Sequence, residues 1–386
     1  MTTMTDSPAL AATVDLSAIA HNVRVVAERA GAPVIAVVKA DGYGHGAVPV
    51  ARAALAAGAV ELGVAHLTEA LTLRAAGIDA HLTSWLHTPG TDFAAGIAAG
   101  VDLAISSPRQ LAAVVAAARE TGTTAIVTAK VDTGMGRSGI APDEWAQTAA
   151  DLARAQAEGA ITLRAMMCHL AFGDEPDHPM NSQQAAGLDA AAADLARLGV
   201  VPEALHLSNS PAALTRPDLS RDLVRPGLAL YGCSPIPGMD FGLIPALTLS
   251  AEVALVKKIP AGQGVSYGHS WITPRDTTIA VLPAGYADGV PRLISGRFEV
   301  SINGRRFPGV GRICMDQLVL DLGPDGGGVS EGDRAVLFGA TPAGEPEVPK
   351  AVDWAETIGT IDYEIVSGIR GRAQRRYVGG DTGGPV

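Results

Sequence analysis

The feature that most constrains this fold is an alternation of short apolar runs with alanine-rich helical stretches, from about residue 14 to residue 240. Each run is apolar on both faces, which is typical of parallel strands that are covered on both sides. The runs are PVIAVVK, VELGVAH, AHLTSW, VDLAIS, AIVTAKVD, ITLRAMMCHL, ALHLSNS and LVRPGLALYG. These eight alternations predict an α/β fold and favour an N-terminal (β/α)8 TIM-type barrel over an open doubly wound sheet.

The helical stretches between these runs have recognisable ends. In SPRQLAAVVAAARETG, Ser107 is the expected N-cap, Pro108 takes the first helical position and Gly122 lies past the end. In DLSAIAHNVRVVAERAG, the same pattern makes Ser17 the expected N-cap and Gly31 the stop. Both stretches therefore predict helices with defined boundaries.

The pattern changes at about residue 245, where runs of β character follow one another. Asn303-Gly304 is a strong signal for a hairpin turn between two of them. The Pro- and Gly-rich stretch PIPGMDFGLIP is the expected junction. We therefore expect a barrel over residues 12–244, a mostly antiparallel β-domain over residues 245–378 and a flexible tail over residues 379–386.

Charge and composition argue against several classes of protein. A net charge of −11 makes nucleic acid an unexpected partner, because phosphate binding needs a basic surface. The basic segment GIRGRAQRRYVGG is interpreted as a solvated strand or tail. No run approaches the ~18 apolar residues of a membrane helix, and MTTMTDSPALAATVD lacks the features of an export signal. The three cysteines are widely spaced, so we expect no disulfide framework, no zinc site and a cytoplasmic location.

Reactive side chains gather where the predicted strands end. In a barrel, catalytic residues come from the C-terminal ends of the strands. The residues at these ends are Lys39, Asp132, Arg137, His169, Asn209, Ser210 and Arg225. Surface residues placed at random would not collect in this way, so the sequence predicts an active site at this rim.

Lys39 closes the apolar run in AVVKADGYGHGA. A lysine at a strand end can extend its charge into solvent, with an ordinary glycine turn behind it. Alternatively, burial lowers the pKa of the amine, and a neutral amine can form a Schiff base. The neighbouring polar groups at the rim favour the second interpretation. A P-loop is excluded because its lysine follows the glycines, whereas Lys39 precedes them.

Two further motifs leave their interpretation open. In KVDTGMGRSG, Arg137 suits a bidentate grip on a carboxylate and equally suits an ion pair with Asp132. In VRPGLALYG, Arg225 is expected within the eighth strand, and N–H groups at Gly227, helped by the Ser210 hydroxyl, suit a phosphate. A simple Pro-Gly bend is the plainer interpretation of that second pattern.

Nine motifs in order, spread over residues 12–377, resemble the alanine racemase family. They are AVVKADGYGHGA, KVDTGMGRSG, CHLAFGDEPDHPMNSQQ, HLSNSPAAL, VRPGLALYG, GVSYGHSW, LPAGYADG, VGRICMDQ and IDYEIVSGI. The resemblance implies a pyridoxal 5'-phosphate enzyme that interconverts L- and D-alanine, the latter for peptidoglycan. It also implies a homodimer whose active sites are shared between the subunits.

The resemblance assigns two groups to catalysis. Lys39 would carry the cofactor as an internal aldimine and act as the base on one face of the substrate. Tyr267 would act on the opposite face and would come from the partner subunit. Two bases suit this reaction, because racemisation removes the α-proton and returns a proton to the other face.

The resemblance also implies binding roles. The cofactor-binding residues would be Lys39, Tyr43, His169, Asn209, Ser210, Arg225 and Tyr363, with the backbone at Gly227 and Leu228. Arg225 would meet the pyridine nitrogen, and because arginine keeps its proton the ring would stay neutral and disfavour transamination. Arg137 and the backbone of Met315 would take the substrate carboxylate, and Tyr286 would line the access channel. Lys130 matches a lysine that is carbamylated in many members.

Other classes of protein share part of this pattern. A barrel-type basic amino-acid decarboxylase has the same two-domain plan, but its glycine-rich phosphate loop lies in the barrel, whereas GGG occurs here only at 326–328. A pyridoxal-phosphate homeostasis protein would be a lone barrel, without the domain that holds Tyr267 and Met315. A racemase of broader specificity would keep most catalytic residues, although such enzymes are often exported.

Several polar residues are interpreted as structural or peripheral. His45 and His206 are expected to be structural, and Cys314 is expected to serve packing. Asp174, Asp177 and His178 are expected in an access loop rather than as metal ligands, because nothing nearby completes a ligand set. No metal site is predicted.

Overall fold

The computed structural model describes residues 8–341 and 344–380. The chain divides into two compact units. The first, called here the barrel unit, comprises Ile19–Gly42 and Ala47–Leu243. The second, called the β-unit, comprises Met1–Ala18, Tyr43–Gly46 and Ile244–Val386. Most of the predicted tail, residues 381–386, lies outside the described residues.

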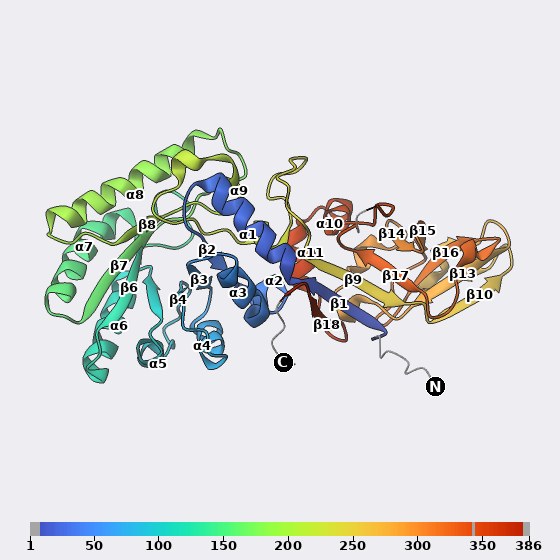
Figure 1. The fold of residues 1–386 in the computed structure, drawn as a ribbon, viewed down its shortest axis with the longest axis horizontal. Helices are drawn as coiled ribbons and strands as arrows, with labels where there is room; N and C mark the ends of the chain where they lie inside the picture. The colour runs from blue at the N-terminus through green and yellow to red at the C-terminus, as the bar shows by residue number, and fades with distance from the viewer. Residues whose placement is uncertain (1–7, 342–343, 381–386) are drawn as a thin grey trace. The chain divides into compact units, whose positions relative to one another are not determined.

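The barrel unit contains a curled sheet of seven parallel strands, with each strand next to the one that follows it in the chain (Figure 1). The strands are β2 (Ile35–Val37), β3 (Glu61–Val64), β4 (His81–Ser84), β5 (Asp102–Ile105), β6 (Ala125–Lys130), β7 (Ile161–Met167) and β8 (Ala204–His206). The main helices are α1 (Leu16–Ala30), α3 (Ala47–Ala56), α4 (Leu67–Ala75), α5 (Phe93–Ala98), α6 (Pro108–Thr121), α7 (Pro142–Ala157), α8 (Pro179–Arg197) and α9 (Ser210–Thr215). The alternation of strand and helix confirms the predicted barrel class.

The strands of this sheet are buried on both faces. Every residue of β2, β3 and β5 is buried, including Glu61 and Asp102, as expected for strands that are covered on both faces. Ile35, Leu62, Leu82 and Leu103 are fully buried and come from four neighbouring strands. Removing this much apolar surface from water is the main stabilising contribution to the unit.

The predicted eighth strand is wrong as a regular strand. Val224 forms only an isolated parallel bridge with Val34, and Leu228–Tyr231 is a 3-10 helix. The segment nevertheless bonds to both neighbours, because Ile35 N–H donates to Val224 O at 2.8 Å and Arg225 N–H donates to Ser208 O at 2.8 Å. Pro226 has no N–H to continue a ladder, which explains why the strand stops there.

Two helix starts test the predicted caps. In α6, Ser107 Oγ accepts from Gln110 N–H at 3.3 Å and Gly122 is left-handed at φ 64°, so both predicted ends are confirmed. In α1, the predicted cap is wrong. Asp15 Oδ1 accepts from Ser17 N–H at 2.8 Å, so Asp15 caps the helix and Ser17 lies inside its first turn.

The β-unit contains a nine-stranded sheet in the order β10-β13-β16-β15-β14-β17-β9-β1-β18. Its strands are β1 (Leu10–Asp15), β9 (Leu247–Glu252), β10 (Leu255–Ile259), β13 (Thr277–Leu282), β14 (Glu299–Ile302), β15 (Arg305–Val310), β16 (Leu318–Gly323), β17 (Arg334–Phe338) and β18 (Gln374–Val378). β11 (Gly264–Val265) and β12 (Trp271–Ile272) form a separate pair, and two helices complete the unit, α10 (Ala351–Ile358) and α11 (Asp362–Gly368). The pairs are antiparallel except β1 with β18, which agrees with the predicted mostly antiparallel domain.

Three local features of the β-unit bear on the sequence analysis. Asn303 and Gly304 have φ of 50° and 74° between β14 and β15, which confirms the predicted hairpin turn. The basic C-terminal segment contributes the largely exposed strand β18, as interpreted. β1 was not foreseen, and it lies between β9 and β18 with Ala11, Ala12 and Val14 buried.

Within the described part of the chain, no helix has both the length and the apolar character that crossing a bilayer requires.

Candidate active site

The barrel rim brings together the reactive side chains that the sequence singled out. They are Lys39 just past β2, Lys130 at the end of β6, His169 just past β7, Asn209 and Ser210 at the start of α9, and Arg225 on the closing segment. Their charges influence one another. After burial, Arg225 and Arg137 are the largest causes that lower the pKa of Lys130. These residues therefore form one cationic cluster at the C-terminal ends of the strands.

Lys39 is half-buried at this rim. Burial lowers the pKa of its amine below the ordinary 10.5, Arg137 lowers it further, Glu69 raises it and Arg225 lowers it. The net shift is downward, so the neutral amine is more accessible than in a solvated lysine. The structure thus favours chemical use of Lys39 over a solvated strand end.

Arg225 is a buried cation held by neutral acceptors. Its Nη1 donates to His206 Nδ1 at 2.6 Å and to His206 O at 2.9 Å, and its Nη2 donates to Cys168 O at 2.8 Å. Burial lowers its pKa to about 10, which leaves the guanidinium charged at neutral pH. Among residues 8–341 and 344–380, no acceptor contacts its Nε–H.

Two histidines beside Arg225 stay neutral. Burial and then the Arg225 charge hold the pKa of both His169 and His206 well below the ordinary 6.5. His169 Nδ1 faces Arg225 Nη2 at 3.4 Å. The sequence analysis interpreted His206 as structural and missed its contact with Arg225. Its place at the last residue of β8, like that of Lys130 on β6, is the signal that could have found it.

Lys130 is buried and donates to Ser138 Oγ at 2.6 Å. Burial, then the charges of Arg225 and Arg137, lower its pKa to about 8, against a smaller opposing effect of Asp132. A share of its amines is therefore neutral near physiological pH.

The alternatives left open for Arg137 can now be separated. Asp132 Oδ1 accepts from the N–H groups of Gly134 and Met135 at 3.0 and 2.9 Å. Burial raises the pKa of Asp132, but these backbone donors and that of Gly136 outweigh it and lower the pKa. No ion pair joins Asp132 to Arg137 in the described chain, and Arg137 is exposed. Its guanidinium is thus available for a carboxylate from outside the chain.

Ser210 and the bend after Arg225 form a small polar cluster. Ser210 is buried, and its Oγ accepts from Gly227 N–H at 2.9 Å and from Ala229 N–H at 3.2 Å. Asn209 caps α9 by accepting from Ala212 N–H at 3.4 Å. A hydroxyl next to backbone N–H groups at such a bend suits an anion.

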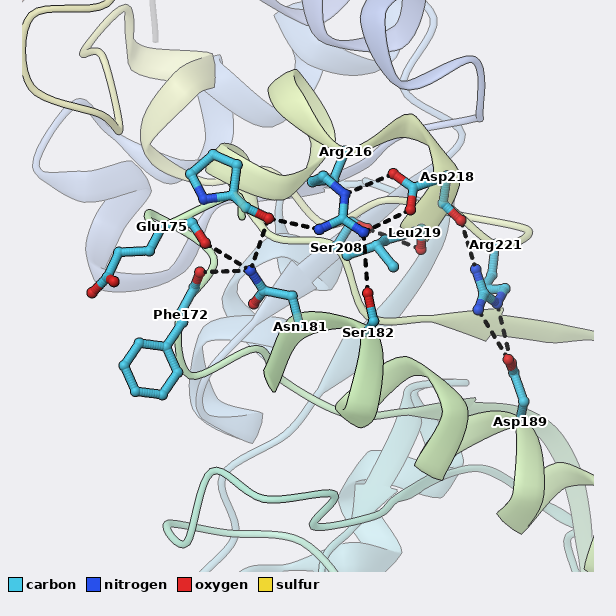
Figure 2. Close-up of polar contacts among 11 residues, drawn as sticks. Phe172, Glu175, Asn181, Ser182, Asp189, Ser208, Arg216, Asp218, Leu219 and Arg221 are labelled. Atoms are coloured by element: carbon cyan, nitrogen blue, oxygen red, sulfur yellow. Dashed lines mark hydrogen bonds and ion pairs between the residues drawn. The ribbon is translucent and has the colours of Figure 1, made fainter. Parts of the chain in front are cut away.

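The loop that follows His169 is tied to α8, as Figure 2 shows. Asn181 donates its amide to Phe172 O and Glu175 O, each at 2.9 Å. Gly173 packs so closely against Asn209 that a Cβ there would lie 2.5 Å from Asn209 Oδ1. The loop is thereby fixed beside the residue that precedes Ser210.

Arg216 holds the same loop from the other side (Figure 2). It donates to Pro176 O at 2.6 Å and pairs with both carboxylate oxygens of Asp218 at 2.8 and 2.7 Å. His178 stacks on Phe172 with ring centres 3.7 Å apart and accepts from Met180 N–H at 3.2 Å. The roles expected for Asp174 and Asp177 at an access loop stay predictions.

The β-unit holds the remaining predicted residues in two groups. In the first, the rings of Tyr43 and Tyr363 lie 6.1 Å apart. Burial, and then the neighbouring Tyr363, raise the pKa of Tyr43, which keeps its hydroxyl protonated. His45 is buried with Nδ1 2.9 Å from Tyr43 O, in keeping with a structural role.

In the second group, Tyr267, Tyr286 and Met315 lie near one another on the surface of the β-unit. Tyr267 is 72% exposed and Met315 is 53% exposed. Ser266, which precedes Tyr267, donates from Oγ to Arg312 O at 2.6 Å and so ties Tyr267 to the Met315 loop. The N–H of Tyr286 donates at 3.1 Å to Cys314 O, the carbonyl of the residue before Met315. Cys314 contacts Ser266 Oγ at 3.4 Å, which agrees with its expected packing role.

Arg372 braces this second group and was missed in the sequence analysis. It donates to both oxygens of the buried Asp288 at 2.9 and 2.8 Å and to Asp316 at 2.7 Å. Asp288 closes the turn that carries Tyr286, and Asp316 directly follows Met315. Arg372 lies in the basic segment that was interpreted as a solvated strand or tail, so these contacts could not be expected from the sequence.

The barrel residues fit pyridoxal phosphate by the chemistry of their donors. The unshared Nε–H of Arg225 suits the lone pair of a pyridine nitrogen, and a neutral His169 suits the face of a ring. The Ser210 hydroxyl beside Gly227 suits phosphate oxygens, and the Lys39 amine suits an aldehyde carbon.

Comparison with known proteins agrees with this site. The profile of the alanine racemase N-terminal domain matches residues 14–235, and that of the C-terminal domain matches residues 246–377. An alanine racemase of Mycolicibacterium vanbaalenii is 57% identical over 97% of this chain and 95% of its own length. One of Mycobacterium tuberculosis is 55% identical over 98% of each chain.

Solved structures give the same result. The alanine racemase of a D-cycloserine-producing Streptomyces lavendulae has a TM-score of 0.92 at 47% identity, covering 97% of this chain and 98% of its own. That of Bartonella henselae, which holds covalently bound pyridoxal phosphate, has a TM-score of 0.86 at 28% identity, covering 96% and 100%. With two domain profiles along most of its length and relatives more than half identical, this chain belongs to the alanine racemase family.

Proposed function

We propose that this protein interconverts L-alanine and D-alanine with pyridoxal 5'-phosphate as its cofactor. Its family and its relatives, which are alanine racemases along nearly their whole length, support the activity. The observation that carries the proposal is the cationic cluster at the barrel rim. There, an amine of lowered pKa, Lys39, lies near the charges of Arg137 and Arg225.

The cofactor is assigned mainly to the predicted barrel, residues 12–244, with Tyr363 as a contact from the predicted β-domain. Lys39 would hold it covalently through Nζ, and Arg225 would donate Nε–H to the pyridine nitrogen. The remaining contacts are assigned to Tyr43, His169, Asn209, Ser210, Gly227, Leu228 and Tyr363. When bound, pyridoxal phosphate withdraws electrons from the substrate α-carbon and makes its proton easier to remove. Because Arg225 keeps its charge at neutral pH, it donates to the ring nitrogen without protonating it.

Two residues are assigned to proton transfer. Lys39 Nζ takes the α-proton on one face and Tyr267 Oη supplies a proton on the other, and the roles reverse for the other enantiomer. The lowered pKa of Lys39 supports its use as a base. Tyr267 is 72% exposed on its own chain, which supports its use in a site completed by a partner subunit.

The substrate carboxylate is assigned to Arg137 and the backbone of Met315. An arginine fork matches a carboxylate with two parallel hydrogen bonds. The exposure of Arg137, together with its lack of an ion pair within residues 8–341 and 344–380, supports this role. Tyr286, which contacts the Met315 loop, is assigned to the access channel.

The chemistry and the family support a proposal for the location, the assembly and the product use of the enzyme. We assign the enzyme to the cytoplasm. We also propose that it is a homodimer whose active sites are shared between the two subunits. Its D-alanine would feed peptidoglycan synthesis. The exposed group formed by Tyr267, Tyr286 and Met315 supports a shared interface.

The experiment that tests the activity measures racemisation of alanine, serine, lysine and arginine from each enantiomer by chiral chromatography. We expect alanine to be the preferred substrate by at least about tenfold, because a small site rejects longer side chains sterically. Lys39→Ala should lose both racemisation and the visible absorbance of the bound cofactor. Faster turnover of lysine or arginine, or an unchanged spectrum in Lys39→Ala, would contradict the proposal.

A further inference from the structure

The backbone that follows Lys39 adopts a conformation that L-residues rarely take. Ala40, Asp41, Gly42 and Tyr43 have φ of 52°, 52°, 61° and 52°. Three of these four residues carry side chains, whose Cβ atoms crowd the backbone in the left-handed region. Such strain persists where surrounding contacts hold it, and it gathers at functional sites.

Glu69 supplies one of the contacts that hold this turn. It lies in the first turn of α4, and its Oε1 accepts from Ala40 N–H at 2.6 Å. Its Oε2 accepts from the N–H groups of Ala65 and His66, both at 2.9 Å. One carboxylate therefore joins the residue after Lys39 to the start of α4.

Two other hydrogen bonds fix the same turn locally. Gly42 N–H donates to Val38 O at 2.9 Å, and Ala47 N–H donates to Asp41 Oδ1 at 2.9 Å. Both join residues that are close in sequence. Glu69 adds a contact from 29 residues away and so anchors the turn to another element.

Glu69 also acts on the charge of Lys39. Burial and Arg137 lower the pKa of the Lys39 amine, Glu69 raises it and Arg225 lowers it. Lys130, whose own pKa is lowered by Lys39, belongs to the same cluster. Glu69 therefore acts on the amine in addition to accepting from the backbone at the start of α4.

We propose that Glu69 is a positioning residue for Lys39, because its carboxylate clamps the left-handed turn and keeps a negative charge near the amine. The inference rests on the proposed function, in which the Lys39 amine bonds the cofactor and transfers a proton. Glu69 acts through Lys39 and through the backbone of Ala40.

Glu69→Gln tests the clamp, because an amide offers only one acceptor oxygen. Its NH2 group must face either Ala40 N–H or the two N–H groups at the start of α4, so one set loses its acceptor. We expect the dissociation constant for pyridoxal phosphate, measured by absorbance titration of the full-length chain, to rise at least about tenfold.

The second measurement follows the amine itself. In the full-length chain freed of cofactor, the pH dependence of Lys39 labelling by acetic anhydride is read by peptide mass spectrometry. We expect the Lys39 pKa to fall by about half a unit or more in Glu69→Gln, because the carboxylate is lost while Arg137 and Arg225 remain. Glu69→Asp keeps the charge but shortens the reach, so it should weaken cofactor binding and leave the pKa closer to that of the wild type.

The matched control is Glu331→Gln. Glu331 Oε1 accepts from Val256 N–H at 3.0 Å in the β-unit, so the same substitution replaces a carboxylate that accepts from the backbone at a place away from Lys39, where one amide oxygen suffices. It should change neither the cofactor affinity nor the Lys39 pKa. If Glu69→Gln folds poorly, Glu69→Asp still tests the clamp through cofactor affinity.

The outcomes separate this inference from the proposed function. Wild-type cofactor affinity and wild-type Lys39 pKa in Glu69→Gln would overturn the role of Glu69. If instead borohydride reduction of the wild-type protein leaves Lys39 without bound cofactor, the proposed function fails. The labelling pKa of Lys39 then still decides whether Glu69 acts on the amine.

Discussion

One residue, Arg225, sets the protonation of its neighbours. It is buried, no carboxylate of residues 8–341 and 344–380 pairs with it, and three neutral acceptors from His206 and Cys168 hold its guanidinium. After burial, its charge is the largest cause that lowers the pKa of His169, His206 and Lys130. Burial, together with this one cation, thus keeps two histidines neutral and makes a lysine amine partly neutral.

The lowered pKa of Lys130 has a chemical consequence. A neutral amine adds to carbon dioxide: the nitrogen lone pair forms an N–C bond, one amine proton leaves, and a carbamate results. The carbamate would place a negative charge beside Arg137 and Arg225, where it is favourable. With 13C-labelled bicarbonate, we expect a carbamate carbonyl signal in NMR spectra of the protein that is absent in Lys130→Met. Equal signals in both proteins would contradict the assignment.

The stability of the same variant checks the pKa. The folded pKa of Lys130 is about 8 and the ordinary value is 10.5, so the unfolded chain binds more protons between these pH values. Stability therefore rises with pH from about 8 to 10.5, and the cost of burying the charge is complete below pH 8. In CO2-free buffer at pH 7, the midpoint of unfolding of Lys130→Met should lie at a higher denaturant concentration than that of the wild type. This difference should shrink toward pH 10.5.

The residue scale also shows how far the sequence could lead. The lowered pKa of Lys39 followed from an apolar strand ending among polar neighbours, and the structure confirms its direction. The contact of His206 with Arg225 could not be predicted, because it joins the end of β8 to the closing segment 19 residues later, which is not a regular strand. Pairing of side chains across strands depends on register, which the apolar pattern alone does not determine.

At the scale of elements, a buried cluster of charged and polar side chains joins four barrel strands. Arg164 on β7 pairs with Glu61 on β3 and lies 3.8 Å from Asp102 on β5. The side chain of Asp102 is fully buried, and it also contacts His81 on β4 at 3.1 Å. Removing one partner of such a cluster leaves the other charges in a poorly solvated place.

Arg164→Met should therefore destabilise the protein by about 3–5 kcal/mol, because Glu61 and Asp102 lose their cation. Urea unfolding followed by circular dichroism measures this. The control is Arg119→Met, since Arg119 pairs with Glu158 on the surface and exposed pairs contribute less than about 1 kcal/mol. Adding Glu61→Gln to Arg164→Met should recover part of the loss. Equal effects of the two arginine variants would contradict a buried cluster.

Elements were predictable where one local rule decided them. The ends of α6 followed from Ser107 and Gly122, and the hairpin between β14 and β15 followed from Asn303-Gly304. The eighth strand failed because Pro226 breaks the ladder, although the apolar run around it continues. At α1, two capping residues stood close together, and the carboxylate of Asp15 prevailed over the Ser17 hydroxyl.

At the scale of the whole molecule, long-range pairing limits prediction. β1, near the N-terminus, pairs with β9 and with β18, more than 300 residues later in the case of Ala11 and Gln374. Its short apolar run resembles the start of the barrel pattern, and only its partners reveal where it belongs. A contact of this separation leaves no periodic trace in the sequence.

Three large side chains of the β-unit are exposed in the single chain. Tyr267 and Met315 are 72% and 53% exposed, although the proposed mechanism needs both at the substrate. Tyr286 is 41% exposed in the same group. Large apolar side chains gathered at a surface are typical of an interface. We propose that a second copy of the chain supplies Tyr267 to the Lys39 of its partner.

Mixing two inactive variants tests this shared site. Lys39→Ala and Tyr267→Ala should each be inactive, because each lacks one of the two proton-transfer groups. After the subunits are exchanged, half of the dimers pair one variant with the other. One of the two sites in each such dimer then has both Lys39 and Tyr267. Racemisation should therefore recover to about one quarter of the wild-type rate. Wild-type protein treated in the same way controls for losses during exchange. If each site were built from one chain, no mixture could contain an intact site, and the activity would stay at the level of the separate variants.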